Sequence, residues 1–185
     1  MTNTMILPGA TLGMLGGGQL GRMFTTAAQI MGYNVIVLDP DTNSPAGVIA
    51  DQHICAKYTD EAALSQLAEQ CDAITTEFEN IPAATLAFLE AKTIVHPSSQ
   101  ALSSTQNRIT EKQFIAALGI PVAPFVAIRS TSDIDNIGTS IQFPAIIKVA
   151  NFGYDGKGQY KINLIDDLKN LNIDLNKLEN TIYFA

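Results

Sequence analysis

The stretch TLGMLGGGQLGRM, Thr11–Met23, sets the architecture of the first half of the chain. Thr11–Leu15 has the composition of a short buried strand, and it leads directly into the consecutive glycines Gly16–Gly18. A helix is expected from Gln19 to Met31, ended by Gly32 at the position where helices favour a left-handed glycine. A strand that passes through a glycine turn into a helix is typical of the first crossover unit of a parallel α/β sheet.

The alternation of strand and helix continues to about Pro97. Strands are predicted at 34–39, 72–77 and 93–97, and helices at 59–71 and after Asn80. Either Thr59 or Asp60 is expected to cap the first of these helices, while Asn80 is expected to cap the second with Pro82 in its first turn. The pattern predicts a Rossmann-like parallel sheet whose ligands bind at the carboxyl ends of its strands.

The composition and the predicted elements change after Pro97. A polar stretch at 98–108 precedes a helix that is predicted at 110–118 and ended by Gly119. Strands are then expected at 124–128, 144–150, 158–165 and 181–185, with a helix at 166–178. A domain boundary is predicted between 98 and 121, with domains 1–108 and 109–185. The apolar residues at 181–185 are expected to form an unpaired edge, which favours the interpretation that the sequence is truncated within its second domain.

Composition excludes several classes of protein. The chain has 185 residues, 46% of them hydrophobic, and a net charge of −7 with no long basic run, so nucleic acid is not expected as a partner. No apolar stretch is long enough to cross a membrane, and the start lacks the pattern of a signal peptide. Two cysteines, Cys55 and Cys71, are not spaced for metal binding, and they fit a reducing cytoplasm.

The first glycine cluster leaves several functions open. Gly16, Gly18 and Gly21 satisfy G-x-G-x-x-G between a strand and a helix, and Asp39 follows at the distance of a ribose-binding acid. The same turn serves other α/β domains that hold a phosphorylated or polar ligand, and it also occurs with no ligand at all. For Asp39, hydrogen bonds within its own turn before Pro40 are favoured over a ribose contact.

A second cluster, GYDGKG at 153–158, differs from a phosphate-binding Walker loop in its short spacing. It lies between two predicted strands, so its amides and Lys157 are expected to cover a polyphosphate as a hairpin loop. Just upstream, Lys148 shares a strand face with Ile146 and Ala150. An ammonium on such a face requires an anion or must extend to the sheet edge, and an anionic ligand is the favoured interpretation.

Six motifs taken together resemble one family. GGGQLGRM, VLDPD, EFENI, QNR followed by EK and F, IIK, and GYDGKGQ are similar in sequence and order to N5-carboxyaminoimidazole ribonucleotide synthetases, the ATPase component of phosphoribosylaminoimidazole carboxylase. These enzymes belong to the ATP-grasp superfamily. The resemblance implies a pre-ATP-grasp domain followed by the first α+β lobe of an ATP-grasp domain.

The resemblance also implies an activity, that of an ATP-dependent C–N ligase of purine biosynthesis. It would couple ATP cleavage to bicarbonate through carboxyphosphate, and transfer the carboxyl group to the exocyclic amine of 5-aminoimidazole ribonucleotide. The products would be N5-carboxyaminoimidazole ribonucleotide, ADP and phosphate. Mg²⁺ would accompany ATP, with its ligands beyond residue 185, and no metal ligand is assigned in this chain. The truncated chain would be inactive alone, and the longer protein would be a cytoplasmic homodimer.

Site residues follow from the same resemblance. Catalytic roles would go to Tyr154, Asp155 and Lys157, with Asp155 orienting the amine or accepting its proton. ATP contacts would come from Arg108, Lys148, Gly153, Tyr154, Asp155, Gly156, Lys157, Gly158 and Gln159. The ribonucleotide would contact Gln19, Leu20 and Glu77. A turn role for Asp155, and a solvated position for Glu77 and Glu79, stay open as alternatives.

Three other functions are weighed against this one. An NAD(P)-dependent oxidoreductase fits Gly16–Gly21 and Asp39, but it gives no account of Lys148 with the second glycine cluster. Another ATP-grasp ligase, such as the formate-dependent glycinamide ribonucleotide transformylase, is disfavoured by EFENI and GYDGKGQ only through resemblance. A non-catalytic nucleotide-binding module is the third.

Overall fold

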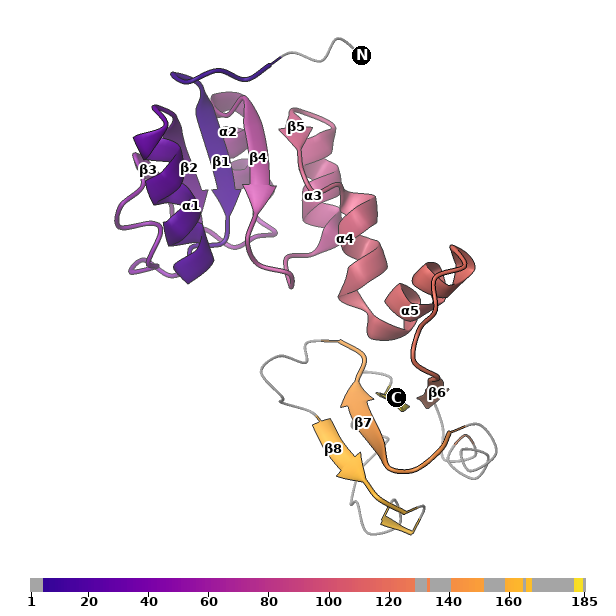
Figure 1. Ribbon diagram of the computed structural model, residues 1–185. Coiled ribbons are helices and arrows are strands. Elements are labelled where there is room, and N and C mark those ends of the chain that lie inside the picture. The colour runs from indigo at the N-terminus through magenta and orange to yellow at the C-terminus, as the bar shows by residue number, and fades with distance from the viewer. Residues whose placement is uncertain are drawn as a thin grey trace. The chain divides into compact units, whose positions relative to one another are not determined.

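The computed structural model describes residues 5–128, 133, 141–151, 159–164, 166–167 and 182–184. The chain forms two compact units, Met1–Ser103 and Ser104–Ala185 (Figure 1). The boundary predicted at residues 108 and 109 lies slightly further along the chain, and it stays a prediction. Each unit contains one sheet.

The first unit is built on a five-stranded sheet with the order β3-β2-β1-β4-β5, in which every neighbouring pair is parallel. Its strands are β1 (Thr11–Leu15), β2 (Asn34–Leu38), β3 (Gln52–Ile54), β4 (Ala73–Thr76) and β5 (Ile94–Val95). The predicted Rossmann-like architecture is confirmed. The short edge strand β3 was not predicted, because three residues carry too little periodicity to be recognised.

Helices cover both faces of this sheet (Figure 1). They are α1 (Gln19–Ile30), α2 (Glu61–Gln70), α3 (Ala83–Glu90) and α4 (Ser99–Gln106). On one face Met14, Val35 and Val37 pack with Ala28 of α1. The alternate residues of the same strands, Leu15, Ile36, Leu38 and Ile74, pack on the other face with apolar side chains of α2, α3 and α4. Side chains of a strand alternate between faces, so a single sheet supports two separate cores.

The ends of two helices follow the predicted signals. Gly32 has φ +87°, directly after the last residues of α1, as expected for a glycine that ends a helix. Asp60 is the cap of α2, because its carboxylate accepts hydrogen bonds from the amides of Ala62 and Ala63. This choice between Thr59 and Asp60 required the structure.

Two expectations about helices were wrong. Asn80 does not cap α3, because the chain makes a further turn that buries Ile81, and the helix begins only after Pro82. The polar stretch at 98–108 contains α4, whose buried Leu102 packs into the core of the first unit. Glu90 accepts hydrogen bonds from the backbone and side chain of Ser99, and these bonds hold the start of that helix.

The second unit contains α5 (Arg108–Ala117) and a four-stranded sheet with the order β6-β9-β7-β8. The strands are β6 (Val126–Ile128), β7 (Ala145–Val149), β8 (Gln159–Ile162) and β9 (Ile182–Phe184), and all their pairings are antiparallel. Asn107 caps α5 through its side-chain oxygen, and Gly119, with φ +77°, follows the end of this helix. The change from a parallel to an antiparallel sheet matches the predicted change from alternating strands and helices to a strand-rich second domain.

The predicted unpaired edge at 181–185 was wrong. Strand β9 lies inside the sheet, where it pairs with β6 on one side and with β7 on the other. Its apolar sequence is therefore that of a central strand, because both of its edges are hydrogen-bonded. The helix predicted at 166–178 falls outside the described residues, apart from Asp166 and Asp167.

Candidate functional site

The glycine turn between β1 and α1 is closely packed against the rest of the first unit. Gly16 has φ +101°, a backbone conformation that favours glycine. A Cβ atom on Gly17 would lie 2.5 Å from the side chain of Ser44, and one on Gly18 would lie 2.8 Å from a carboxylate oxygen of Glu77. Contacts within the protein itself therefore disfavour larger residues at these positions, without any ligand.

Two carboxylates accept hydrogen bonds from backbone amides of this turn. The amide of Gly17 donates to Asp39 at 2.7 Å, and the amide of Gly18 donates to Glu77 at 2.9 Å. Gly18 is the N-cap of α1, so both acids lie where the positive end of the helix favours negative charge. In a dinucleotide-binding domain these amides face the pyrophosphate. Here internal carboxylates hold them, which disfavours the oxidoreductase interpretation.

Asp39 is fully engaged within the protein. Its carboxylate also accepts hydrogen bonds from the hydroxyl of Tyr58 at 2.7 Å and from the amide of Asp41 at 2.8 Å, and the residue is only 8% exposed. The predicted turn role of Asp39 is confirmed by the bond from Asp41. Burial raises the pKa of the Tyr58 phenol, and the hydrogen bond to the Asp39 carboxylate raises that pKa further. Tyr58 therefore stays a neutral donor at physiological pH.

Replacing Asp39 by asparagine is expected to destabilise the protein by about 2 kcal/mol, because donors that now face a charged acceptor would face a neutral amide. The loss should appear in the free energy of unfolding measured with urea. Tyr58→Phe is the matched control, since it removes one of the same hydrogen bonds without changing the charge of the acid. If Asp39→Asn destabilises the protein less than Tyr58→Phe does, the central role of the carboxylate is contradicted.

The predicted ribonucleotide residues of the first unit lie together. Gln19 and Leu20 form the start of α1, where Leu20 is 63% exposed, and Glu77 holds the Gly18 amide beside them. All three lie at the carboxyl edge of the parallel sheet. Glu77 is partly buried and accepts this hydrogen bond, so it is more than a solvated loop acid. Their contact with a ribonucleotide stays a prediction.

Phe78 was not assigned a role from sequence. It is 41% exposed beside Glu77, and its ring centroid lies 6.3 Å from that of Tyr58. Phe78 is therefore an exposed aromatic side chain directly after a residue predicted to contact the ribonucleotide. The signal in the sequence was the EFEN motif itself, in which only the acids were considered.

The two cations predicted to contact ATP are connected through the backbone in the second unit. The amide of Arg108, the first residue of α5, donates at 2.9 Å to the carbonyl of Ala150, which directly follows β7. Lys148 lies two residues earlier, near the end of that strand. The Arg108 guanidinium forms an ion pair with Glu111 at 2.9 Å, and it remains half exposed. The structure thus brings the start of α5 to the Lys148 end of β7.

Lys148 is partly buried, and within the described part of the chain it forms no ion pair. The strand register places it directly opposite Gln159 of β8, and it places Ile146 opposite Lys161. These four side chains share one face of the sheet, because paired residues of an antiparallel ladder point the same way. Among them no acid offsets the two ammonium groups.

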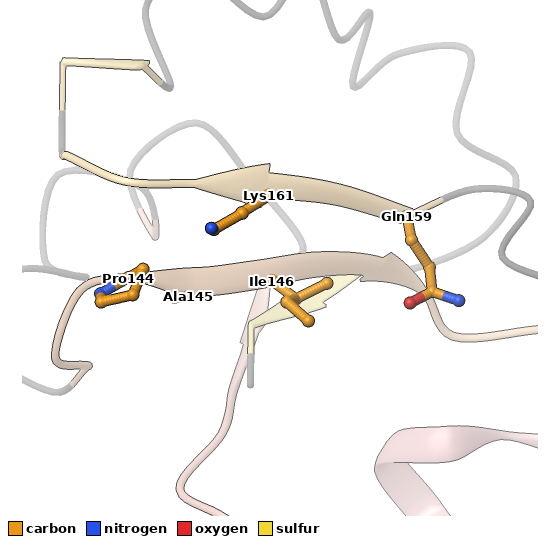
Figure 2. Close-up of a pocket in the computed structure, with 5 residues that line it drawn as sticks. All are labelled: Pro144, Ala145, Ile146, Gln159 and Lys161. Carbon is orange, nitrogen blue, oxygen red and sulfur yellow. The ribbon is translucent and has the colours of Figure 1, made fainter.

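A pocket of about 340 Å³ opens on this β7–β8 hairpin (Figure 2). It is lined by Pro144, Ala145, Ile146, Gln159 and Lys161. Gln159 was predicted from sequence, but Lys161 was not, because the register of the hairpin was needed to place it on the face of Lys148. The remaining predicted loop residues, Gly153, Tyr154, Asp155, Gly156, Lys157 and Gly158, lie outside the described residues.

Among the described residues, no group of three or more His, Cys, Asp or Glu side chains could hold a metal ion. His53 has a structural partner, with Nε2 lying 3.1 Å from the carbonyl of Asp39. Both cysteines are free, and burial raises the pKa of Cys71 to about 12. No helix in the described part of the chain is long and apolar enough to span a membrane.

Comparison with known families defines the class of this protein. Residues 9–106 match the ribonucleotide synthetase preATP-grasp domain, and residues 113–184 match the ATP-grasp domain. The chain belongs to the ribonucleotide synthetase family that carries this preATP-grasp domain. The predicted order, a parallel-sheet domain followed by an ATP-grasp portion, is confirmed.

Individual relatives show which synthetases of this family the chain is similar to. The chain is 46% identical over 161 residues to an N5-carboxyaminoimidazole ribonucleotide synthase of Staphylococcus aureus strain COL, an alignment that covers 87% of this chain and 43% of the relative. The chain therefore spans less than half the length of the curated relatives it matches. The predicted resemblance to these synthetases is confirmed over both domains.

Solved structures agree in fold. An N5-carboxyaminoimidazole synthetase from Staphylococcus aureus complexed with ADP superposes with a TM-score of 0.90 at 42% identity, covering 96% of this chain and 48% of that one. A synthase from Aspergillus clavatus in complex with ADP and 5-aminoimidazole ribonucleotide has a TM-score of 0.78 at 28% identity, covering 95% of this chain and 46% of that one.

Proposed function

We propose that the protein is an ATP-dependent ligase that carboxylates 5-aminoimidazole ribonucleotide with bicarbonate. The products are N5-carboxyaminoimidazole ribonucleotide, ADP and phosphate, and carboxyphosphate is the intermediate. The observation that carries this proposal is the 46% identity with an N5-carboxyaminoimidazole ribonucleotide synthase across both units of the chain. The ligands named for the Aspergillus clavatus relative, ADP and 5-aminoimidazole ribonucleotide, support the same pair of substrates here.

The second unit supplies the contacts with ATP. Lys148 has an ammonium without an ion-pair partner in the described part of the chain, and Arg108 starts the helix that is hydrogen-bonded to the end of the same strand. As the γ-phosphate moves from ATP to bicarbonate, negative charge develops on the departing ADP. These cations stabilise that charge, and Arg108 must exchange its bond with Glu111 for a phosphate oxygen.

The residues from Gly153 to Gln159 complete this site in the proposal, with the backbone of the glycines and Lys157 contacting the phosphates. Tyr154 and Asp155 face the aminoimidazole. Its exocyclic nitrogen attacks the carboxyl carbon, the bond from that carbon to the phosphate oxygen breaks, and one proton leaves the nitrogen. Asp155 orients the amine or accepts this proton.

The first unit supplies the contacts with the ribonucleotide. Gln19 and Leu20 line its pocket, and Glu77 is held in place by the Gly18 amide, so that its carboxylate is oriented before the ligand arrives. ATP is proposed to bind with Mg²⁺, for which the described residues offer no ligand cluster. Bicarbonate as the carbon source, a cytoplasmic location and a homodimer remain predictions from the resemblance.

The alternative functions are less well supported. A nicotinamide cofactor would require the amides of Gly17 and Gly18 to face its pyrophosphate, but internal carboxylates hold them. The formate-dependent transformylase is also an ATP-grasp ligase, so the fold alone does not separate it from the proposed function. Substrate dependence does separate the two.

The deciding experiment measures ADP release by the protein expressed from its own gene. We expect release to require both 5-aminoimidazole ribonucleotide and bicarbonate, and Asp155→Asn to lower the rate by at least about 100-fold. Formate with glycinamide ribonucleotide should not support release. Release that is independent of aminoimidazole ribonucleotide, or an Asp155→Asn variant as active as the parent, would contradict the proposal.

A further inference from the structure

Lys161 of β8 has no role in the function proposed above, yet it lies on the same sheet face as Lys148. The register sets Lys161 opposite Ile146, one row along the hairpin from the row formed by Lys148 and Gln159. Lys161 is exposed, and in the described residues it forms no ion pair. Diagonal neighbours on a sheet face are about 7–8 Å apart, so two like charges of this kind favour a shared anionic ligand.

The pocket beside Lys161 suits the less charged part of such a ligand. Its lining includes the apolar side chains of Pro144 and Ile146, and Ile146 is 38% exposed to solvent. Figure 2 shows Lys161 extending over the end of the hairpin at which Pro144 lies, with Gln159 at the opposite end. Its volume of about 340 Å³ is within the range for small-molecule sites. An apolar floor with one ammonium is a suitable setting for a planar base.

The two rows of the hairpin are not equivalent. The Lys148 row is next to Ala150, whose carbonyl accepts the backbone amide of Arg108, so both residues assigned to the phosphates in the proposed function start from this end of the strand. The Ile146 and Lys161 row is one pleat repeat further away, a distance of about 7 Å along the strands. A nucleotide whose phosphates lie against Lys148 therefore reaches the Lys161 row with its nucleoside end.

We propose that Lys161 is a nucleoside-binding residue of the ATP site, donating hydrogen bonds to acceptors of the base or ribose while Ile146 packs against the base. This inference rests on the proposed function, since it takes ATP as the ligand. It assigns Lys148 and Lys161 different parts of one molecule: Lys148 binds the phosphates, and Lys161 binds the nucleoside.

The test measures dissociation constants for ATP and for inorganic tripolyphosphate, the latter by competition with radiolabelled ATP in equilibrium dialysis. The protein is that expressed from its own gene, in about 0.15 M salt, where screening reduces long-range effects of charge. Lys161→Met should raise the dissociation constant of ATP by about tenfold and that of tripolyphosphate by less than about twofold. Lys161→Arg should retain ATP affinity within about threefold, because it keeps a donor. Lys57→Met, at an exposed lysine of the first unit, is the charge-matched control.

Each outcome has a defined meaning. If Lys161→Met weakens the binding of ATP and of tripolyphosphate equally, the nucleoside assignment is overturned. An unchanged affinity for ATP would overturn it as well. Far-UV circular dichroism and the melting temperature of the variant check that its fold is intact. If the unsubstituted protein does not bind ATP, the proposed function fails; if it binds ATP and Lys161→Met is without a selective effect, only the present inference fails.

Discussion

Lys148→Met is expected to weaken ATP binding by about 100-fold and to leave the fold as stable as that of the parent. Methionine is close to lysine in length, so the partly buried position stays filled. In the described part of the chain the ammonium has no ion-pair partner whose loss would destabilise the native state. Binding is measured by equilibrium dialysis with ATP, and stability by urea unfolding.

The two measurements together separate a ligand role from a structural one. Lys57→Met makes the same change of charge at an exposed site of the first unit, and it should alter neither quantity by more than its error. A structural lysine would behave in the opposite way, with a loss of several kcal/mol in stability and little selective effect on ATP. Parent-like ATP affinity in Lys148→Met would remove this residue from the site.

Gly21→Ala is expected to destabilise the protein by about 3 kcal/mol, although alanine is the better helix former. Gly21 is a buried residue of α1, and a Cβ atom there would lie 2.6 Å from the carbonyl oxygen of Gly16. That oxygen belongs to the turn whose amides bind Asp39 and Glu77, so it cannot move without disturbing those bonds. Helix propensity alone predicts a gain of about 1 kcal/mol, so the sign of the effect is the test.

Thr26→Ala provides the control on the same helix. Thr26 is exposed, and its substitution should change the free energy of unfolding by no more than about 0.5 kcal/mol. Both variants are compared by urea unfolding, with the slope of the transition checked for two-state behaviour. A Gly21→Ala variant as stable as Thr26→Ala would mean that the glycine turn has room for a methyl group beside the Gly16 carbonyl.

The architecture of the first unit was largely predictable from local signals. The glycine turn, Gly32 and the periodicity of the helix at 59–71 each depend on neighbours in sequence, and each was placed correctly. Helix α4 was missed because a serine-rich segment has little intrinsic pattern. It forms because Leu102 is buried and because Glu90 binds its first residues, and both effects are tertiary.

The candidate site was less predictable for the same reason. G-x-G-x-x-G followed by an acid looks alike whether the turn binds a dinucleotide or its own carboxylates. The difference arises from hydrogen bonds between Gly17 and Asp39, and between Gly18 and Glu77, which are remote in sequence. Lys161 was missed because only the pairing of β7 with β8 places it beside Ile146.

The position of the nucleotide is best measured in crystals of the protein grown with ADP and Mg²⁺. We predict density for the phosphates beside Lys148 and Arg108, and for the base beside Ile146 on the β7–β8 hairpin. The amides of Gly17 and Gly18 should still bind Asp39 and Glu77. Phosphate density at the glycine turn, with those carboxylates displaced and the hairpin face empty, would contradict the assignment of the ATP site to the β7–β8 hairpin.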